Sequence, residues 1–530
     1  MKRIAIASLT GLLSVIVIIA CTDLSETVYS DVLASEFYQT EEEIIASMAP
    51  AYGELRNYAN SNLYRVRSMG TDEIVTPTRG RHWYDGGAFQ RFHEHSWSTD
   101  HNWLRNSWDI LFSWVNRSNM LQFQYAQMTG MNPELRDQFT AELKMIRAFA
   151  YYQLIDFFGN VPIVDRFDVP EDFSAANNSN FETGRTEVFN FIEQDILSNI
   201  DNLNDNVDPS TYGRFHKYAA HAILVRLYMN AETWTDTPRW DDAIAHADAI
   251  INSGHFDLEP DYFFNFSLNN RSSSENIFVV PFEDGRTGGN MSNMAYVNHH
   301  HYQMGRYFNA PRGGNNGISA IPSHYRSFDE VDRRRNGWLT GPLYDTSTGA
   351  ALVCTEESAP HPLNYTVDYV NIYDPSDNAV YDYRNALEYH GARMVKWEIN
   401  YNSSAGNDLA VIRYADILLL KAEALMRKNA GSATQEAVNI VNQVRERAFE
   451  NPSQHEYTTA TLTLDELLAE RSRELYFEGV RRNDLVRFNK WVRGDWEWAD
   501  RSNEGDYRNV FPIPQHHINV NPNLTQNPGY

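Results

Sequence analysis

Apolar residues recur at helical spacing in three consecutive stretches near the C-terminal end of the chain. The first, residues 413–428, is apolar nearly all round, which predicts a buried helix. The second, residues 435–448, carries one apolar stripe and follows a candidate capping box that runs from Ser432 to Gln435. The third is predicted to begin at the capping box of Thr463 and Glu466 and to end at Gly479.

Helical periodicity also covers most of the first 251 residues. Thr40 is expected to open a helix that runs towards Tyr58. Further helices are predicted over residues 103–128, 143–157, 186–200, 216–232 and 240–251. Residues 218–251 and 413–448 each have about the length and the alanine and leucine pattern of a tetratricopeptide repeat. The spacing between them is not constant, so a regular solenoid is not predicted.

The middle of the chain has a different character. Between residues 256 and 409, Gly, Asn, Pro, Ser and Tyr dominate, and short apolar pieces such as 277–281 predict strands. So long an irregular segment in a compact protein is usually functional. We therefore predict a mostly α fold. A tetratricopeptide-like helical scaffold (about 36–255 and 410–500) would carry a loop-rich half with short strands (about 256–409, plus the loop 70–101).

Four glutamates of the third C-terminal helix form a row, because Glu466, Glu470, Glu474 and Glu478 are four residues apart. Like charges at this spacing cost about 0.2–0.5 kcal/mol per pair. The row could in principle be a carboxylate metal site or an acid/base pair, but the Glu-x-x-His partners of a bundle metal site do not occur. We interpret it as a structural ion network, compensated by nearby arginines: Arg471, Arg473, Arg481, Arg482 and Arg487.

Composition and the N-terminus restrict the location and the partners. The formal net charge is −25 without a basic patch, which argues against a nucleic-acid partner. Lys2 and Arg3 precede an apolar stretch, and residues 18–21 resemble a bacterial lipobox. We therefore expect a signal peptide over residues 1–20 and a lipid on Cys21, which would anchor the protein to a membrane. The alternative is an uncleaved anchor helix.

Motifs for catalysis and metal binding are largely missing from the sequence. It contains no glycine-rich phosphate loop, Gly-x-Ser-x-Gly elbow or His-Glu-x-x-His motif. The runs His299–His301 and His93 with His95 could bind a metal, but adjacent histidines do not share a helix face. We expect surface or loop histidines instead, and no metal site.

Residues 79–87 are the clearest candidate for binding. They place Trp83 and Tyr84 among glycines, Arg81 and Asp85. The C–H faces of sugars pack on aromatic rings, and their hydroxyls need Asp, Asn or Arg partners. Residues 290–307 and Trp338 have a similar composition. The 12 Trp, 30 Tyr and 27 Phe exceed what a helical core normally uses. The alternative is that these aromatic residues fill minor cores under long loops.

The chain as a whole resembles the SusD/RagB family of Bacteroidetes outer-membrane lipoproteins. The resemblance covers nearly the whole chain and rests on the order and spacing of its motifs rather than on any single one. These are the lipobox at Cys21, Thr71-Asp72-Glu73, and residues 141–164, 321–335, 413–425, 441–448, 470–488 and 511–530.

The resemblance implies a role and a site. Such proteins form a single unit, here residues 21–530, tethered by lipid at the outer-membrane surface. Each caps a TonB-dependent transporter of the SusC type and delivers a captured nutrient, usually a glycan. They are not enzymes and need no cofactor, although some relatives hold a structural calcium ion. The ligand contacts expected here are Asp72, Arg81, Trp83 and Tyr84, with Tyr296, Tyr302, Tyr307 and Trp338.

Two alternatives to glycan capture stay open at this point. Some relatives take peptides rather than glycans, and the dense Trp and Tyr near Gly86 and Gly87 favour sugar over peptide. A surface glycoside hydrolase that uses two acidic residues is the other alternative. The sequence does not identify the glycan; a β-glucan is one hypothesis.

Overall fold

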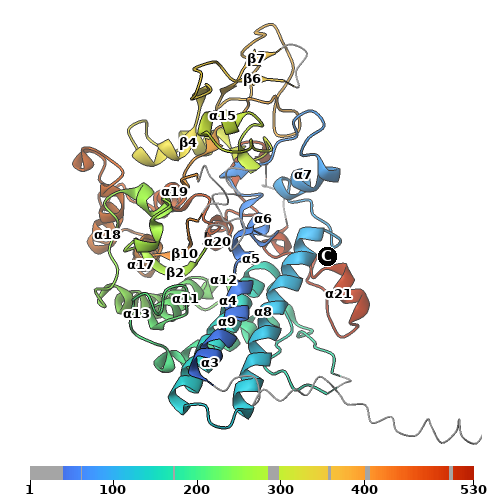
Figure 1. The fold of residues 1–530 in the computed structure, drawn as a ribbon, viewed down its shortest axis with the longest axis vertical. Coiled ribbons are helices and arrows are strands. Elements are labelled where there is room, and N and C mark those ends of the chain that lie inside the picture. Colours follow the sequence, from blue (N-terminus) through green and yellow to red (C-terminus); the bar gives the residue numbers. More distant parts are fainter. Residues whose placement is uncertain are drawn as a thin grey trace, which may run out of the picture.

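The computed structural model of the protein describes residues 40–60, 62–170, 173–283, 298–355, 360–399, 406–500 and 505–530. Figure 1 shows most helices in the lower part of the molecule, with the loop-rich segment projecting at the top. The predicted mostly α fold is confirmed. The predicted signal peptide and Cys21 lie outside the described residues. Of the helices described, none combines the length and the hydropathy needed to cross a membrane.

The scaffold contains all the long helices together with several short ones, and the remaining short helices lie in the loop-rich segments and at the C-terminal end. The scaffold helices are α3 (Glu41–Ser47), α4 (Ala49–Glu54), α5 (Asn57–Asn60), α6 (Asn62–Ser68), α8 (Asn102–Gln127), α9 (Pro133–Phe158), α10 (Phe181–Leu197), α11 (Lys217–Met229), α12 (Ala231–Thr235), α13 (Trp240–Ile251), α17 (Tyr414–Lys428), α18 (Gln435–Glu446), α19 (Leu464–Leu475) and α20 (Arg481–Arg487). The others are α7 (Ala88–His93), α15 (Met304–Phe308), α16 (Pro322–Arg326) and α21 (Gln515–Val520). Single 3-10 turns are η1 (Asp85–Gly87), η2 (Ile200–Asn202), η3 (Tyr262–Phe266), η4 (Asn270–Ser272), η5 (Arg333–Gly337), η6 (Pro452–Gln454) and η7 (Asp506–Asn509).

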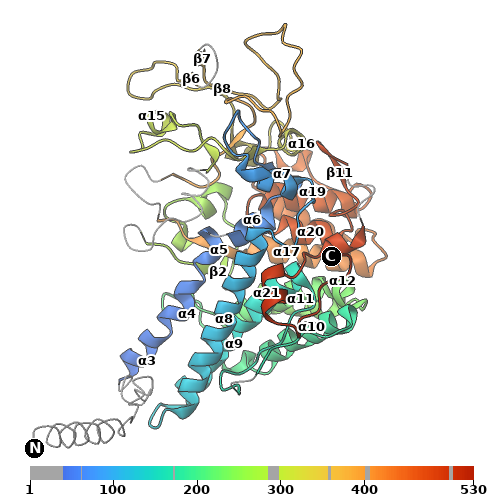
Figure 2. The same ribbon diagram turned by 90° about the vertical axis from the view of Figure 1, so that its right-hand side faces the viewer.

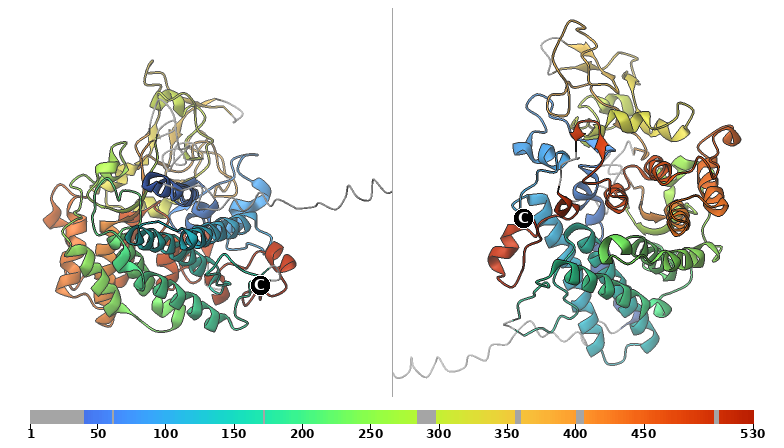
Figure 3. Two further views of the ribbon diagram at one scale, coloured as in Figure 1. Left: turned by 60° about the horizontal axis from the view of Figure 1, so that its bottom comes forward. Right: turned by 180° about the vertical axis from the view of Figure 1, so that it is seen from behind.

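Successive scaffold helices pack as pairs. α8 packs against α9, α11 against α13, and α17 against α18. α13 also contacts α17, so the second pair stacks on the third although about 160 residues separate them. Figures 2 and 3 show these helices layered on one side of the molecule. The two helix pairs predicted over residues 218–251 and 413–448 are therefore present.

Most helix starts lie close to where the sequence predicts them, whereas breaks and ends of helices were predicted less well. Thr40 opens a helix as predicted, and it forms a capping box with Glu43. The helix that follows is broken, and Pro50, which has no N–H to donate, lies in the first turn of α4. Thr463 caps α19 as predicted, but the helix ends at Leu475 rather than at Gly479.

The predicted capping box at Ser432 is wrong. Thr434 is the N-cap of α18, and its side chain accepts a hydrogen bond from the backbone N–H of Ala437 (3.1 Å). The side chain of Gln435 donates forward to Asn439 (2.8 Å) instead of reaching back to Ser432.

Short antiparallel strand pairs organise the loop-rich half. β2 (Asn276–Val280) pairs with β10 (Leu409–Arg413) in the register Leu409 to Val280, which joins the two ends of this half. The strand predicted over 277–281 is thus confirmed. The other pairs are β1 (Ile74–Val75) with β3 (Ser319–Ala320), β4 (Trp338–Leu339) with β9 (Arg393–Met394), β5 (Gly341–Pro342) with β8 (Asn364–Tyr365), β6 (Val353–Cys354) with β7 (His361–Pro362), and β11 (Asp495–Trp496) with β12 (Ala499–Asp500).

One large apolar core runs through the scaffold and into the loop-rich half, where it includes Phe278, Trp338 and Trp397. The projecting lobe, which carries β5 to β8, has a smaller core of its own around Leu343 and Tyr365. The loop-rich half is therefore partly fused to the scaffold and partly independent of it.

The glutamate row is a buried ion network, as predicted. Glu470 and Glu474 are fully buried, whereas Glu466 at the start of the row is exposed. Glu474 contacts Arg447 (2.7 Å), Arg413 (3.1 Å) and Arg334 (3.2 Å). Burial alone would raise the pKa of Glu474, yet these three charges lower it below its usual value.

The compensating arginines differ from the predicted ones. Of the five arginines near the row, Arg473 pairs with a row member, Glu470 (2.8 Å). The other cations that pair with the buried glutamates of the row come from elsewhere in the chain. They are Arg334, Lys396, Arg413, Arg445 and Arg447. Because three of these residues lie in or beside the loop-rich half, the network joins that half to the scaffold.

Candidate functional site

Arg79 fixes the segment that carries the predicted aromatic residues. This segment follows β1, and the Arg79 side chain within it is 2% exposed. Its guanidinium donates hydrogen bonds to the backbone carbonyls of Asn316 (3.0 Å), Leu387 (2.5 Å) and His390 (2.9 Å). One buried side chain therefore holds together three stretches that are up to 311 positions apart.

Trp83 is held in an uncommon backbone conformation. Its φ is +62°, a left-handed value that costs a non-glycine residue about 1–3 kcal/mol. The indole Nε1 donates to the carbonyl of Asn315 (2.7 Å), and the ring packs edge-on against Phe89 at 5.4 Å. A Cβ on Gly317 would lie 2.6 Å from the indole, so only glycine fits beneath it. These contacts fix both the position and the tilt of the ring.

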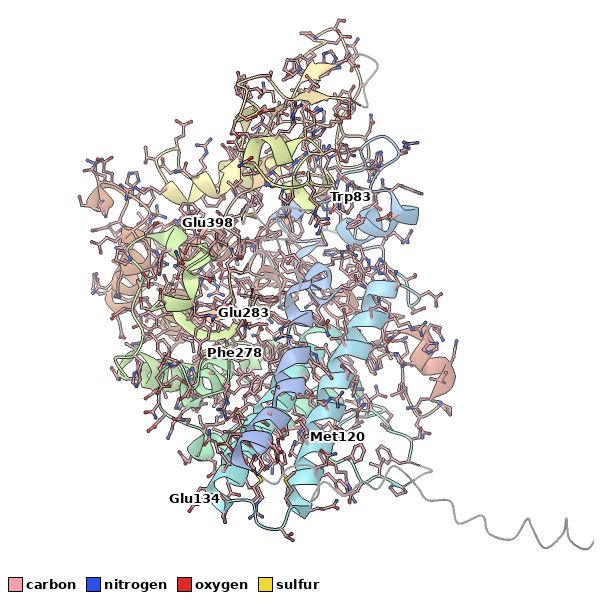
Figure 4. The ribbon with its side chains drawn as sticks, viewed as in Figure 1. Trp83, Met120, Glu134, Phe278, Glu283 and Glu398 are labelled. Carbon is pink, nitrogen blue, oxygen red and sulfur yellow. The ribbon has the colours of Figure 1, made fainter. Side chains whose placement is uncertain are left out.

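Tyr84 extends the aromatic surface outwards. Its side chain is 52% exposed, and its carbonyl accepts a hydrogen bond from the N–H of Gly87 (2.6 Å). Arg81 and Asp85, on either side, are also exposed. We call Trp83 and Tyr84 the aromatic platform. Figure 4 shows Trp83 between α7 and the loop-rich half.

The predicted tyrosines of the loop-rich half lie in different surroundings. Tyr302 comes close to the platform segment, since its ring centroid is 6.1 Å from that of His82. Tyr307 in α15 packs against the core of the projecting lobe. Tyr296 lies outside the described residues.

Trp338 and Asp72 are held by partners elsewhere in the protein. Trp338 is 4% exposed and stacks on Tyr476, with 5.4 Å between ring centroids. The half-buried Asp72 makes a bidentate ion pair with Arg481, with contacts of 2.7 and 2.6 Å. The predicted residues that the structure gathers into one region are Arg81, Trp83, Tyr84 and, at its edge, Tyr302.

Surface or loop histidines were predicted, and neither run lies at the surface, although His300 and His301 do lie in a loop. His299, His300 and His301 are 0% exposed, and His93 and His95 are also buried. His300 contacts the carbonyl of Met394, and His301 contacts the Glu388 carboxylate (2.9 Å). They pack against backbone and side chains that come from distant parts of the chain. Over the described residues, no three His, Cys, Asp or Glu side chains are grouped so as to hold a metal ion.

Asn315 and Gly317 were not singled out from the sequence, although both shape the platform. Their signal was the glycine- and asparagine-rich run at residues 313–317, which is typical of a tight, irregular backbone. Arg79 belonged to the predicted segment, but its anchoring role depends on partners more than 230 positions away.

The chemistry of the platform favours binding. An indole and a phenol ring offer apolar faces, while Arg81 and Asp85 next to them offer a hydrogen-bond donor and an acceptor. A ligand with alternating apolar and hydroxyl-bearing surfaces matches this combination.

Comparison with known proteins agrees with this description. The model of the SusD family matches residues 263–530, and a model described as starch-binding associating with outer membrane matches residues 24–229. The starch-binding protein SusD of Bacteroides thetaiotaomicron is 26% identical over 515 residues, covering 89% of this chain and 86% of that protein.

Solved structures share the fold. A laminarin-binding SusD-like protein has a TM-score of 0.71 at 23% identity, covering 93% of this chain and 100% of that one. Surface glycan-binding protein A from Bacteroides thetaiotaomicron, in complex with laminarihexaose, has a TM-score of 0.66 at 20% identity, covering 92% and 99%. Because the model of the SusD family matches more than half of the chain, this protein belongs to the SusD family.

Proposed function

We propose that this protein captures a neutral glycan at the outer membrane on the aromatic platform and passes it to a partner transporter. The observation that carries the proposal is the conformation of Trp83. A tryptophan at a φ of +62° is held there by Asn315, Phe89 and Gly317, and it stands beside the exposed Tyr84. Strain of this kind persists where surrounding contacts determine the position of a side chain, commonly at binding sites.

Relatives support a glucan as the ligand class. One similar protein is named as starch-binding, one as laminarin-binding, and one was solved with laminarihexaose. The platform supplies rings that can stack on sugar faces and charged groups that can bind hydroxyls. This combination suits a glucan whatever its linkage. We therefore propose a glucan oligosaccharide as the ligand and leave the linkage to a binding panel.

Binding without catalysis is the proposed mode of action. The relatives are named as binding proteins, and the glutamate row that could have supplied an acid/base pair is buried among arginines. A carboxylate with a lowered pKa and no access to ligand is a poor general acid.

Replacing Tyr84 with alanine is expected to weaken glucan binding about fivefold to tenfold, because one exposed ring face is lost. Such a face contributes about 1 kcal/mol to the free energy of binding. Tyr344→Ala is the matched control, since Tyr344 is 49% exposed but lies next to β5, on the projecting lobe. Calorimetry with laminarihexaose, maltohexaose and cellohexaose measures both. Equal loss in the two variants would contradict the platform. Release of reducing sugar by the wild type would contradict a purely binding role.

The proposed location and partner follow from the family and from Cys21. We infer that Cys21 carries the lipid and that a SusC-like TonB-dependent transporter receives the glycan. Wild-type protein is then expected in the membrane fraction and should co-purify with such a transporter after cross-linking. Cys21→Ser should move to the soluble fraction with its glucan affinity intact. A membrane-bound Cys21→Ser variant would contradict the lipid anchor.

A further inference from the structure

A groove of about 1240 Å³ lies in the described part of the chain, away from the aromatic platform. Its walls come from the loop before α11, the turn around η4 and the residues after β2, including Tyr212, Arg271 and Glu283. Figure 4 places Glu283 far from Trp83 and nearer to the helical scaffold. None of the predicted ligand contacts that the structure describes lines this groove, and Tyr296 lies outside the described residues.

A buried carboxylate fixes the positions of Tyr212 and Arg271, the aromatic ring and the cation of the groove. Asp408 is 1% exposed and accepts hydrogen bonds from the Tyr212 hydroxyl (2.7 Å), the Arg271 Nε (3.1 Å) and the N–H of Phe282 (2.7 Å). The Arg271 guanidinium lies over the Tyr212 ring, 5.6 Å from its centroid. An aromatic ring and a cation are thus positioned in advance, which lowers the cost of ordering them on binding.

The rest of the lining is polar but not strongly charged. Asn269 and Ser272 are exposed at the turn, and Pro281 adds an apolar face opposite. The side-chain nitrogen of Asn276 donates to a backbone carbonyl (2.8 Å), whereas its buried Oδ1 has no hydrogen-bond partner among the described residues. The exposed amide of Asn269 and hydroxyl of Ser272 are therefore the polar groups that a ligand hydroxyl can reach.

The described charges of the groove do not favour a polyanionic ligand. Among the described lining residues, Arg271 is paired with Asp408 at 3.1 Å, and the remaining charges are those of Asp208 and Glu283, both negative. The described part of the lining therefore offers no excess of positive charge for phosphate or sulfate groups. A ring, a proline face, amides and hydroxyls together suit a neutral, hydroxyl-rich ligand.

We propose that this groove is a second binding site for a neutral oligosaccharide, separate from the aromatic platform. The class of ligand rests on the proposed function, but the residues of the groove are independent of the platform. Two sites on one rigid protein would hold a long polysaccharide more tightly than either site alone, because the second contact becomes intramolecular.

The test uses full-length protein and changes the groove and the aromatic platform, first separately and then together. Ser272→Arg places a long side chain at the groove, and the serine it replaces donates only within its own turn, to Asn269 (3.2 Å). Ser453→Arg is the matched control, because Ser453 is exposed in η6 and does not line the groove. Arg271→Ala is a second groove variant that leaves Asp408 bonded to Tyr212 and Phe282. Circular dichroism and thermal unfolding confirm that each variant folds.

Calorimetry gives the number of ligands bound per protein. It uses whichever of laminarihexaose, maltohexaose or cellohexaose binds the wild type. Two ligands per protein are expected for the wild type and Ser453→Arg, one for Trp83→Ala and for each groove variant, and none for Trp83→Ala combined with Ser272→Arg. One ligand in the wild type, abolished by Trp83→Ala alone, would overturn the second site but support the platform. Wild-type protein that binds none of the three sugars would overturn the proposed function as well.

Discussion

Trp83→Ala is expected to lower glucan affinity at the platform at least about 30-fold, a larger loss than Tyr84→Ala should cause. Removal of a well-packed tryptophan at the centre of a binding surface typically costs about 2 kcal/mol or more, and each tenfold in affinity corresponds to about 1.4 kcal/mol. The indole is also the group whose tilt is fixed, through Asn315 and Gly317. Calorimetry with the preferred hexasaccharide measures the change.

Trp83→Phe distinguishes the contribution of the aromatic ring from that of the indole hydrogen bond. Phenylalanine keeps an aromatic face but cannot donate the 2.7 Å hydrogen bond to Asn315. We expect an intermediate affinity, because the ring can still stack but its tilt is less well determined. Thermal unfolding of all three proteins controls for misfolding. An unchanged affinity in a folded Trp83→Ala protein would remove this residue from the site.

Glu474→Ala is expected to lower the free energy of unfolding by about 3–5 kcal/mol, because it removes one of the carboxylates that neutralise a cluster of buried arginines. Arg334 and Arg413 are fully buried, the side chain of Arg447 is 5% exposed, and all three contact this carboxylate. Urea unfolding monitored by circular dichroism measures the loss. The affinity for glucan below the unfolding transition should not change, since none of these residues belongs to the platform.

The same row of glutamates supplies the matched control. Glu466→Ala removes an exposed carboxylate that accepts a hydrogen bond from the Tyr457 hydroxyl (3.1 Å), while the backbone N–H at position 466 keeps its bond to the Thr463 cap (3.1 Å). Exposed substitutions usually change stability by less than about 0.5 kcal/mol. Similar destabilisation by the two variants would show that burial of Glu474 does not matter. A loss of affinity without loss of stability in Glu474→Ala would return the row to the ligand-binding residues.

The fold was predictable where short-range patterns decide it. The apolar stripe of residues 435–448 and the nearly all-apolar stretch 413–428 predicted α18 and α17 within a few residues. The break after Leu475 was not predicted, because it depends on tertiary contacts. Phe477 adopts a φ of +62° there and packs its ring against Tyr64 and His299, which come from distant parts of the chain.

The candidate site was predictable to a similar degree. Trp83 and Tyr84 stood out because they lie among glycines and charged residues in a long loop, a composition that suits sugar binding. Composition could not separate them from Trp338, which has the same chemistry but stacks on Tyr476, 138 positions later. Nor could it show that Asp72 pairs with Arg481, 409 positions away. Burial is decided by contacts that no local pattern records.

The way Arg79 is bound has a consequence for how the ligand preference of this protein can change. Its partners are backbone carbonyls, which every residue type provides, so the frame beneath the platform does not depend on which side chains occupy positions 387 and 390. Trp83 adds one hydrogen bond to the carbonyl of Asn315, but the bonds that Arg79 makes do not depend on the side chains at positions 83 and 84. Exchanging those two side chains for others could therefore redirect the protein to a different sugar while its architecture stays intact.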